Sequence, residues 1–474
     1  MLVVLLVIAV VLAVLAGVHW YVWRRLVRDT TVPGSAVRRV GTVAVVLLPL
    51  LSVGALVSGR AGAPFWLEQV LAWPGYLWLA VLLYLTLALV VAEGVRPVLR
   101  RVLARRDDTR SALGPAAAAD AVAGGTGVTD MAASARPSTG GAGERAPAAA
   151  GESVDSSGGI AVAVDGGPDA DAPRSDAAAG VAAGAGSGGA ADVREDARPE
   201  LSRRLFVARV AGGAAAAVAA GTVGYGTYGV LRGPRVKRVT VPLAKLPRGA
   251  HGYRIAVVSD IHLGPILGRA HTQRIVDTIN ATQPDLVAVV GDLVDGSVAD
   301  LGRAAEPLAQ LRARHGSYFV TGNHEYFSGA DAWVDHVREL GLTPLRNDRV
   351  EIAGFDLAGV DDVAGESEGQ GPDFDRALGD RDRTRASVLL AHQPIVIDDA
   401  VRHGVDLQLS GHTHGGQLWP GNFVAELANP TVAGLERYGD TQLYVSRGAG
   451  AWGPPVRVGA PSDITVVELA SRQA

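Results

Sequence analysis

Three long apolar segments near the N-terminus limit the fold of this chain more than any other feature. Leu2 to Trp23 is interrupted only by His19, Val43 to Val57 is the core of a second segment, and Val70 to Ala92 is a third. A helix of about 20 apolar residues spans roughly 30 Å of hydrocarbon, whereas apolar runs in soluble cores rarely exceed about 14 residues. We therefore predict three transmembrane helices within residues 1–103 and a multi-pass protein of the cell membrane.

The arginines predict how these segments are oriented. Only Arg60 lies between the second and third segments. Cytoplasmic loops collect Lys and Arg, so the N-terminus is expected outside and the chain is expected to leave the third segment inside. The arginines that mark the inner side are Arg24, Arg25, Arg28, Arg38 and Arg39 before the second segment, and Arg96, Arg100, Arg101, Arg105 and Arg106 after the third.

A polar stretch and a further apolar segment follow. Residues 104–201 are rich in Ala, Gly, Asp and Ser, and we predict a disordered linker because so few large apolar residues cannot offset the entropy of ordering. Residues 202–232 begin with SRRLF and continue as an Ala/Gly/Val-rich segment. This segment is either a fourth transmembrane helix or a signal anchor that resembles a twin-arginine export signal. If it crosses outward, the C-terminal domain is extracytoplasmic, as we expect; otherwise that domain is cytosolic and lies against the membrane.

Composition excludes several kinds of chemistry. The sequence contains no Cys, which rules out disulfides, thiolate zinc sites and cysteine nucleophiles. The formal net charge of −4 gives no sign of a basic surface, so nucleic acid is not an expected partner.

Residues 250–474 show short β-branched runs that alternate with helical stretches, a pattern typical of an α/β domain with parallel strands. A helix is expected over His271 to Thr282, before Pro284. The predicted strands are Arg254 to Ser259, Leu286 to Val290, Ser317 to Val320, Ser387 to Leu390, Asp406 to Leu409, Leu443 to Ser446 and Ile464 to Leu469.

Five of these strands end in residues that commonly bind metals. The segments are Asp260-Ile-His262, Gly291-Asp292-Leu-Val-Asp295, Gly322-Asn323-His324-Glu325, His392, and Gly411-His412-Thr-His414. Ligands bind beyond the carboxyl ends of strands in open α/β sheets, so these loops are expected to converge. The remaining histidines, His271 among them, are expected on the surface or on helices.

The same segments carry a family resemblance. SDIHLG, VVGDLVDG, TGNHEY, LLAHQP and LSGHTHGGQ resemble, in this order, the five blocks of the calcineurin-like metallophosphoesterases, and the tail resembles membrane-linked bacterial members. The resemblance covers about Arg254 to Leu469. It implies an α/β fold (an α+β sandwich) of two mixed β-sheets flanked by helices, here preceded by transmembrane helices and the linker.

The resemblance also implies two divalent metal ions. The first would be bound by Asp260, His262, Asp292 and His414, and the second by Asp292, Asn323, His392 and His412. Oxygen and imidazole donors suit Mn, Fe, Zn or similar ions. A shared carboxylate can hold two cations about 3.5–4 Å apart, and such a pair lowers the pKa of water so that hydroxide attacks phosphorus in line.

The resemblance also implies catalytic roles for two further residues. His324 would protonate the leaving oxygen or steady the phosphoryl charge. Asp295 would fix the tautomer of His324, although an Asp after a strand can also simply cap a turn. Trp452 either lines the substrate entrance or packs on the last strand, and we favour the packing role.

The sequence thus predicts a membrane-anchored dinuclear phosphoesterase that hydrolyses a phosphodiester, pyrophosphate or phosphomonoester. The bilayer is one partner, and the anchor makes a lipid-linked phosphate or a nucleotide-sugar plausible as substrate. The alternative is a membrane-anchored sensor that binds metal or phosphate without turnover. A transporter is not indicated, because the apolar segments contain few ionisable residues.

Overall fold

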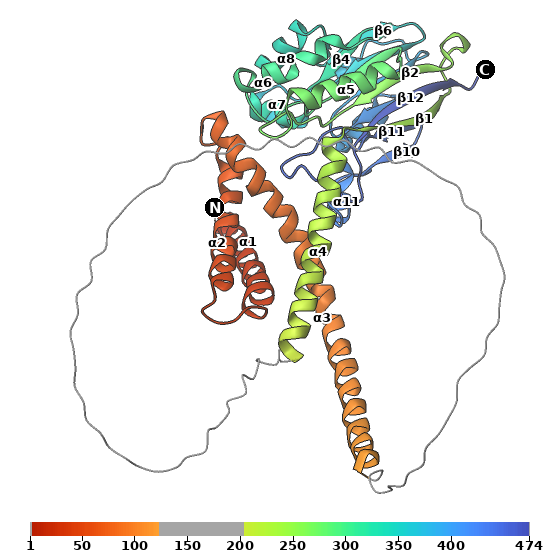
Figure 1. The fold of residues 1–474 in the computed structure, drawn as a ribbon. Helices are drawn as coiled ribbons and strands as arrows, with labels where there is room; N and C mark the ends of the chain where they lie inside the picture. The colour runs from red at the N-terminus through yellow and green to blue at the C-terminus, as the bar shows by residue number, and fades with distance from the viewer. Residues whose placement is uncertain (1, 123–202, 474) are drawn as a thin grey trace, which may run out of the picture. The chain divides into compact units, whose positions relative to one another are not determined.

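The computed structural model describes residues 2–122 and 203–473 (Figure 1). Its N-terminal part is helical, with α1 (Leu2–Val22), the π-helix η1 (Trp23–Arg28), α2 (Ala36–Val57), α3 (Phe65–Val122) and α4 (Arg203–Leu231). Residues 9–28, 36–57, 65–99 and 205–231 are long and apolar enough to cross a membrane. Large apolar side chains stay exposed along these helices, Leu50 at 63% for example, as expected where acyl chains replace water.

α3 runs into the stretch that we predicted as a linker. α3 continues to Val122, past the predicted boundary at residue 103. Residues 104–122 are rich in Ala and Arg, which have high helix propensity and can extend a helix without a core to pack on. The rest of the predicted linker, residues 123–201, lies outside the described residues.

Two mixed β-sheets follow, in the orders β1-β12-β2-β3-β4-β5 and β10-β11-β9-β8-β7-β6. The first contains β1 (Arg235–Leu243), β2 (Tyr253–Val258), β3 (Leu286–Val290), β4 (Ser317–Val320), β5 (Thr343–Pro344) and β12 (Asp463–Ser471). The second contains β6 (Asp348–Ile352), β7 (Phe355–Gly359), β8 (Ala386–Leu390), β9 (Leu407–Ser410), β10 (Gly434–Tyr438) and β11 (Thr441–Val445).

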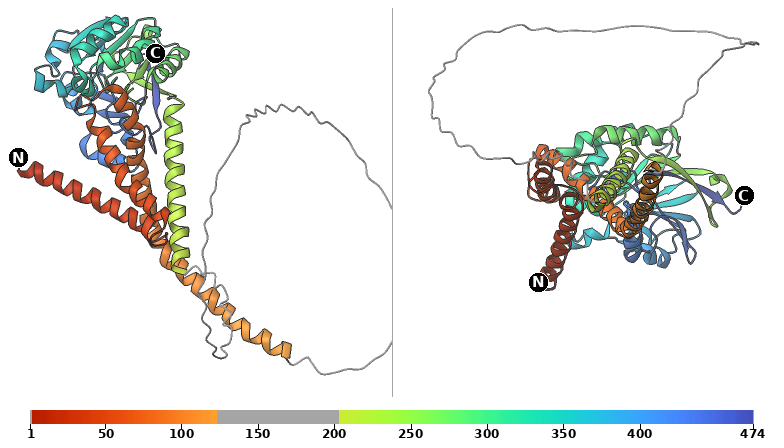
Figure 2. Two further views of the ribbon diagram at one scale, coloured as in Figure 1. Left: turned by 60° about the vertical axis from the view of Figure 1, so that its left-hand side comes forward. Right: turned by 60° about the horizontal axis from the view of Figure 1, so that its bottom comes forward.

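Apolar side chains from both sheets form the central core, and helices enclose the outer faces (Figure 2). The helices of this domain are α5 (Arg269–Ala281), α6 (Val298–Ala305), α7 (Asn323–Ser328), α8 (Ala330–Glu339), α9 (Phe374–Leu378), α10 (Ile397–Arg402) and α11 (Gly421–Ala428). α5, α6 and α8 pack on the first sheet, and α9 and α10 on the second. The predicted sandwich of two mixed sheets flanked by helices is confirmed.

The β-sandwich begins earlier than residue 250. β1 pairs in parallel with β12 along its whole length, from Arg235 with Asp463 to Leu243 with Ser471. The alternation of exposed and buried residues in RVKRVTVPL is the pattern of a half-buried strand. α4 therefore leads into the sheet after a turn of only a few residues.

Parallel pairing brings the polar loops to one edge. β2, β3 and β4 are parallel neighbours in one sheet, and β8 and β9 are parallel neighbours in the other. Hydrogen bonds join the sheets at this edge. Among them, Nδ1 of His392 donates to the carbonyl of Val290 at 2.9 Å, and the backbone N–H of His412 donates to the Asp260 carboxylate at 3.0 Å. All five segments that follow these strands consequently face one another.

Candidate metal centre

The loops at this edge have an unusual backbone conformation. Asp260, His262, Asp292, His412 and His414 all have φ between 48° and 70°, in the left-handed region that non-glycine residues seldom adopt. Such strained residues gather at functional sites because the surrounding fold holds them there. All five residues lie within four residues of a strand end, so this conformation belongs to the turns that follow the strands.

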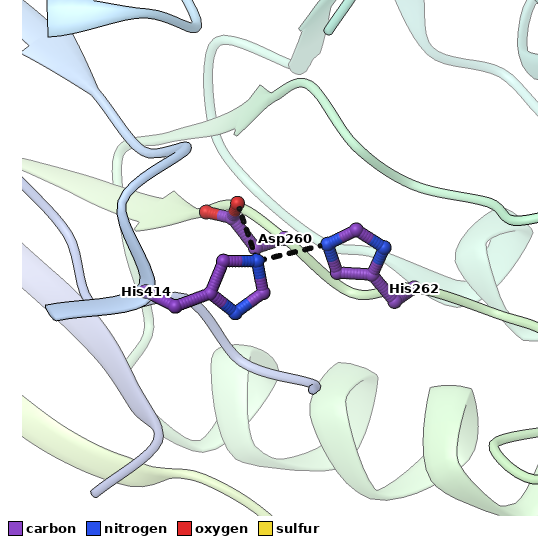
Figure 3. Close-up of side chains that lie close together, drawn as sticks. All are labelled: Asp260, His262 and His414. Atoms are coloured by element: carbon purple, nitrogen blue, oxygen red, sulfur yellow. Dashed lines mark hydrogen bonds and ion pairs between the residues drawn. The ribbon is translucent and has the colours of Figure 1, made fainter. Parts of the chain in front are cut away.

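One group of potential ligands consists of Asp260, His262 and His414 (Figure 3). Nε2 of His414 lies 3.2 Å from Oδ1 of Asp260 and 3.0 Å from Nε2 of His262. The Asp260 and His262 side chains are fully buried. Two imidazole nitrogens that face each other beside a carboxylate repel unless a positive charge, either a proton or a metal ion, lies between them.

A second group consists of Asp292, His392 and His412. Nε2 of His392 lies 3.1 Å from Oδ2 of Asp292, yet among the described residues it has no hydrogen-bond partner with acceptable geometry. Nδ1 of His412 lies 2.9 Å from Oδ1 of Asn323, which brings the amide into the same group. A buried imidazole nitrogen without a partner costs free energy, and a metal ion would satisfy it.

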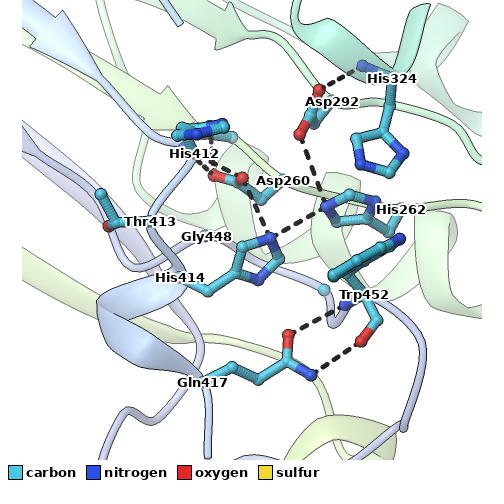
Figure 4. A network of polar contacts seen from close by, with 12 residues as sticks. Asp260, His262, Asp292, His324, His412, Thr413, His414, Gln417, Gly448 and Trp452 are labelled. Carbon is cyan, nitrogen blue, oxygen red and sulfur yellow. Dashed lines mark hydrogen bonds and ion pairs between the residues drawn. The ribbon is translucent and has the colours of Figure 1, made fainter. Parts of the chain in front are cut away.

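Asp292 connects the two groups. Its Oδ2 atom lies 3.8 Å from Nε2 of His262 in the first group (Figure 4). The same atom lies 3.1 Å from Nε2 of His392 in the second group. The structure thus brings together all seven residues predicted as ligands, and we refer to them as the candidate metal centre: Asp260, His262, Asp292, Asn323, His392, His412 and His414. Their oxygen and nitrogen donors fit divalent transition-metal ions.

The two residues predicted to be catalytic lie beside this centre. Oδ1 of Asp295 lies 2.6 Å from Nδ1 of His324 and 2.9 Å from Nδ1 of His262. The backbone N–H of His324 donates to Oδ1 of Asp292 at 2.9 Å, which ties the position of His324 to the carboxylate between the two groups. Asp295 therefore holds two imidazoles, one inside the centre and one at its edge.

Charge is distributed unevenly among these groups. Burial alone would raise the pKa of Asp295, but the imidazoles of His262 and His324 outweigh it and lower the pKa to about 2. Burial would lower the pKa of His262, but the Asp295 and Asp292 carboxylates raise it to about 9. Burial lowers the pKa of His412 to about 4. These carboxylates thus favour the protonated form of His262, so a metal ion that binds this imidazole would have to displace a proton.

Close packing at two glycines leaves no room for another residue. A Cβ at Gly322 would overlap the carboxylate of Asp292, and one at Gly411 would overlap Ser259 and the carboxylate of Asp260. These glycines allow the backbone of one loop to approach the ligands of another.

Sequence reasoning missed the role of two buried residues. The Glu325 carboxylate accepts hydrogen bonds from the backbone N–H groups of Asp292, Leu293 and Gly322 at 2.6 to 2.9 Å, so it fastens the loop after β3 to the loop after β4. Arg457 lies within hydrogen-bonding distance of Nδ1 (3.0 Å) and the carbonyl (3.1 Å) of His414. Glu325 stands inside the GNHE motif and could have been found there; nothing in the sequence marks Arg457.

Trp452 does not have the packing role that we favoured. Its side chain is 54% exposed, and its ring centroid lies 5.7 Å from that of His324. It lies in the loop between β11 and β12 and lines the pocket beside the candidate metal centre.

The fold and the grouped ligands define a metallophosphoesterase, and the comparisons with known proteins agree. Residues 253–416 match the model of the calcineurin-like phosphoesterase family. An Aquifex aeolicus metallophosphoesterase is 35% identical over 240 residues, with 50% of this chain and 91% of that protein covered. A Bacillus subtilis metallophosphoesterase is 30% identical over 287 residues, with 57% of this chain and 99% of that protein covered. This chain belongs to the calcineurin-like phosphoesterase family.

A Danio rerio relative carries the name "transmembrane protein with metallophosphoesterase domain" and is 40% identical over 259 residues. The alignment covers 52% of this chain and 59% of that relative, so this chain spans little more than half of it. Together with the four apolar helices, this likeness supports a membrane protein that carries a metallophosphoesterase domain. The family is metal-dependent, and the Asp and His groups could bind divalent ions.

Proposed function

We propose that the protein is a membrane-anchored, dinuclear metal-dependent phosphoesterase that hydrolyses a phosphodiester, pyrophosphate or phosphomonoester. The observation that carries the proposal is the position of Asp292, within 4 Å of imidazole nitrogens from both ligand groups. One carboxylate between two sets of donors is the arrangement expected for a metal pair that contacts a single phosphate.

In this proposal Asp260, His262 and His414 would hold one ion, Asn323, His392 and His412 would hold the other, and Asp292 would serve both. Two divalent ions bound there would supply Lewis-acid activation of water and neutralise phosphate charge. Mn, Fe and Zn ions all suit these donors.

His324 is the proposed proton donor. Because its Nδ1 atom is held by Asp295 at 2.6 Å, Nε2 is the ring nitrogen available to the pocket. As the oxygen of water loses a proton and bonds to phosphorus, the bond from phosphorus to the leaving oxygen breaks, and Nε2 of His324 transfers its proton to that oxygen. The proton that the water loses restores His324. The products are an alcohol, or a phosphate where the substrate is a pyrophosphate, and a phosphate with one ester or anhydride bond fewer.

The catalytic domain is proposed to face the outside of the cell. α4 leads directly into β1, and the arginine-rich loops between α1 and α2 and after the apolar part of α3 favour the inner side. The bilayer is then a constant partner of the domain, and nucleic acid is not expected as a substrate.

The experiment is hydrolysis of bis(p-nitrophenyl) phosphate by the full-length protein in detergent with Mn²⁺, compared with Asp292→Asn. We expect clear turnover by the wild type and a loss of at least about 100-fold in the variant. Metal content and thermal stability with and without Mn²⁺ are measured on the same samples. A wild type that binds metal but hydrolyses the ester no faster than Asp292→Asn would favour a sensor without turnover and defeat the proposal.

A further inference from the structure

A pocket of about 660 Å³ lies beside the candidate metal centre and is built from two parts of the chain. His324, Trp452 and Phe327 line it from the metallophosphoesterase domain. Both aromatic rings meet the His324 ring edge to face, at centroid distances of 5.7 Å for Trp452 and 5.5 Å for Phe327. Exposed aromatic rings at an enzyme centre provide a surface for an apolar group of a ligand.

The opposite wall comes from the end of α2 and the beginning of α3. Leu56, Phe65 and Tyr76 line the pocket from these apolar helices. Arg60, in the turn between the helices, is the one Lys or Arg among the described residues that line the pocket, which also contains the carboxylates of Glu68, Asp295 and Asp300. The wall of the catalytic pocket is therefore made by segments that are long and apolar enough to span a bilayer.

This wall is held firmly in place. The Tyr76 hydroxyl donates to the carbonyl of Ala55 at 3.1 Å, and the Ser52 hydroxyl donates to the carbonyl of Gly75 at 2.8 Å. A Cβ on Gly75 would come within 2.8 Å of Ala55, so the two helices pack with backbones nearly in contact. A wall of this kind is preformed for a ligand and loses little entropy on binding.

The domain also presents an apolar surface where it meets these helices. The Tyr84 hydroxyl of α3 donates to the carbonyl of Trp419 at 3.0 Å, and Leu418 packs into the cluster formed by α3 and α4. Next to this contact, Trp419, Phe423, Val424 and Leu427 are between 51% and 88% exposed. Apolar residues that continue the surface of membrane-spanning helices fit contact with lipid. The pocket itself lies at the ends of two candidate spans, 36–57 and 65–99, which form one of its walls.

We propose that the pocket binds a phosphate ester that carries an apolar chain, with the phosphate at the candidate metal centre and the chain along Leu56 and Phe65. This inference rests on the proposed phosphoesterase function and specifies its substrate as an amphiphile of the membrane. A soluble nucleotide-sugar would leave the apolar wall without a partner.

The test uses p-nitrophenyl alkyl phosphates in which only the alkyl chain varies, from methyl to octyl. Each is hydrolysed by the full-length protein in nanodiscs to p-nitrophenol and the alkyl phosphate. We expect kcat/KM to rise at least about tenfold from methyl to octyl, since each buried methylene contributes favourably. The quantity compared between variants is the ratio of octyl to methyl kcat/KM, because partition of the octyl ester into lipid affects every variant equally.

Leu56→Ala removes part of the apolar wall, and Leu56→Trp narrows the pocket. We expect each variant to lower the ratio of octyl to methyl kcat/KM about threefold or more. Leu50→Ala is the matched control, on the same helix but outside the pocket, and should leave the ratio unchanged. A ratio near one, or a high ratio that neither Leu56 variant lowers, overturns the inference while the proposed function stands. Failure to hydrolyse any of the esters defeats the proposed function and this inference with it.

Discussion

One carboxylate oxygen of Asp295, Oδ1, contacts both His324 and His262. It lies 2.6 Å from Nδ1 of His324 and 2.9 Å from Nδ1 of His262. One carboxylate therefore orients both a proposed metal ligand and the proposed proton donor. Because each imidazole has its Nδ1 atom on Asp295, each presents Nε2 to the region where substrate and metal would bind.

Replacing these two residues should produce different defects. His324→Ala is expected to lower kcat by about 10² to 10⁴-fold with metal content unchanged. The loss should be larger for an alkyl leaving group than for p-nitrophenolate, which needs little protonation. Asp295→Asn should lower both metal affinity and kcat by about 10- to 100-fold, because His262 loses its orientation as well. Equal losses for the two leaving groups in His324→Ala would rule out the proton-donor role.

A methyl group at Gly322 should damage the metal centre. Gly322→Ala places Cβ against the Asp292 carboxylate, so we expect at least about tenfold weaker Mn²⁺ binding in a titration followed by thermal shift. Gly249→Ala is the control, since among the described residues no heavy atom lies within 4 Å of its added Cβ. Unchanged binding in Gly322→Ala would mean that Asp292 has freedom to move.

His271 should make the domain sensitive to acid. It is buried on α5, not on the surface, and neither ring nitrogen has a hydrogen-bond partner among the described residues. Burial, with Arg274 and Arg457 nearby, lowers its pKa from the usual 6.5 to about 3. Below pH 6.5 the unfolded chain binds a proton that the folded chain does not, so stability present above pH 6.5 is lost as the pH falls toward 3.

The loss amounts to about 1.4 kcal/mol per pH unit at most. Between pH 6.5 and 5, the wild type should therefore lose roughly 2 kcal/mol more than His271→Leu in denaturant unfolding. His251→Gln, at an exposed histidine, should follow the wild type. Parallel stability curves for wild type and His271→Leu would contradict this account of His271.

The side of the membrane can be measured directly because the sequence contains no Cys. A single cysteine replaces Ser367, which is exposed in the catalytic domain, or Val32, which is 58% exposed between α1 and α2. In intact cells a membrane-impermeant maleimide should label Ser367→Cys, and it should label Val32→Cys only after permeabilisation. The opposite pattern would place the domain in the cytoplasm.

Most of the candidate metal centre could be predicted from sequence because its residues directly follow strands. Each of the five segments follows a strand that ends at the shared edge. The strand pattern and the residue types after it were therefore sufficient to predict ligands such as Asp260 and His412. Arg457 and Trp452 reach the centre through a long loop whose path depends on tertiary packing. The sequence likewise did not reveal β1, whose partner β12 is at the other end of the chain, or the wall that α2 and α3 add to the pocket.

The most direct test of the central claim, that Asp292 is shared by two metal ions, is the metal content of the purified full-length protein. Elemental analysis should find close to two divalent ions per chain in the wild type, about one in His392→Gln and less than one in Asp292→Ala. Asp335→Asn, at a side chain 73% exposed, should retain the wild-type value. Two ions per chain in Asp292→Ala, or no more than one in the wild type under saturating Mn²⁺, would contradict the account.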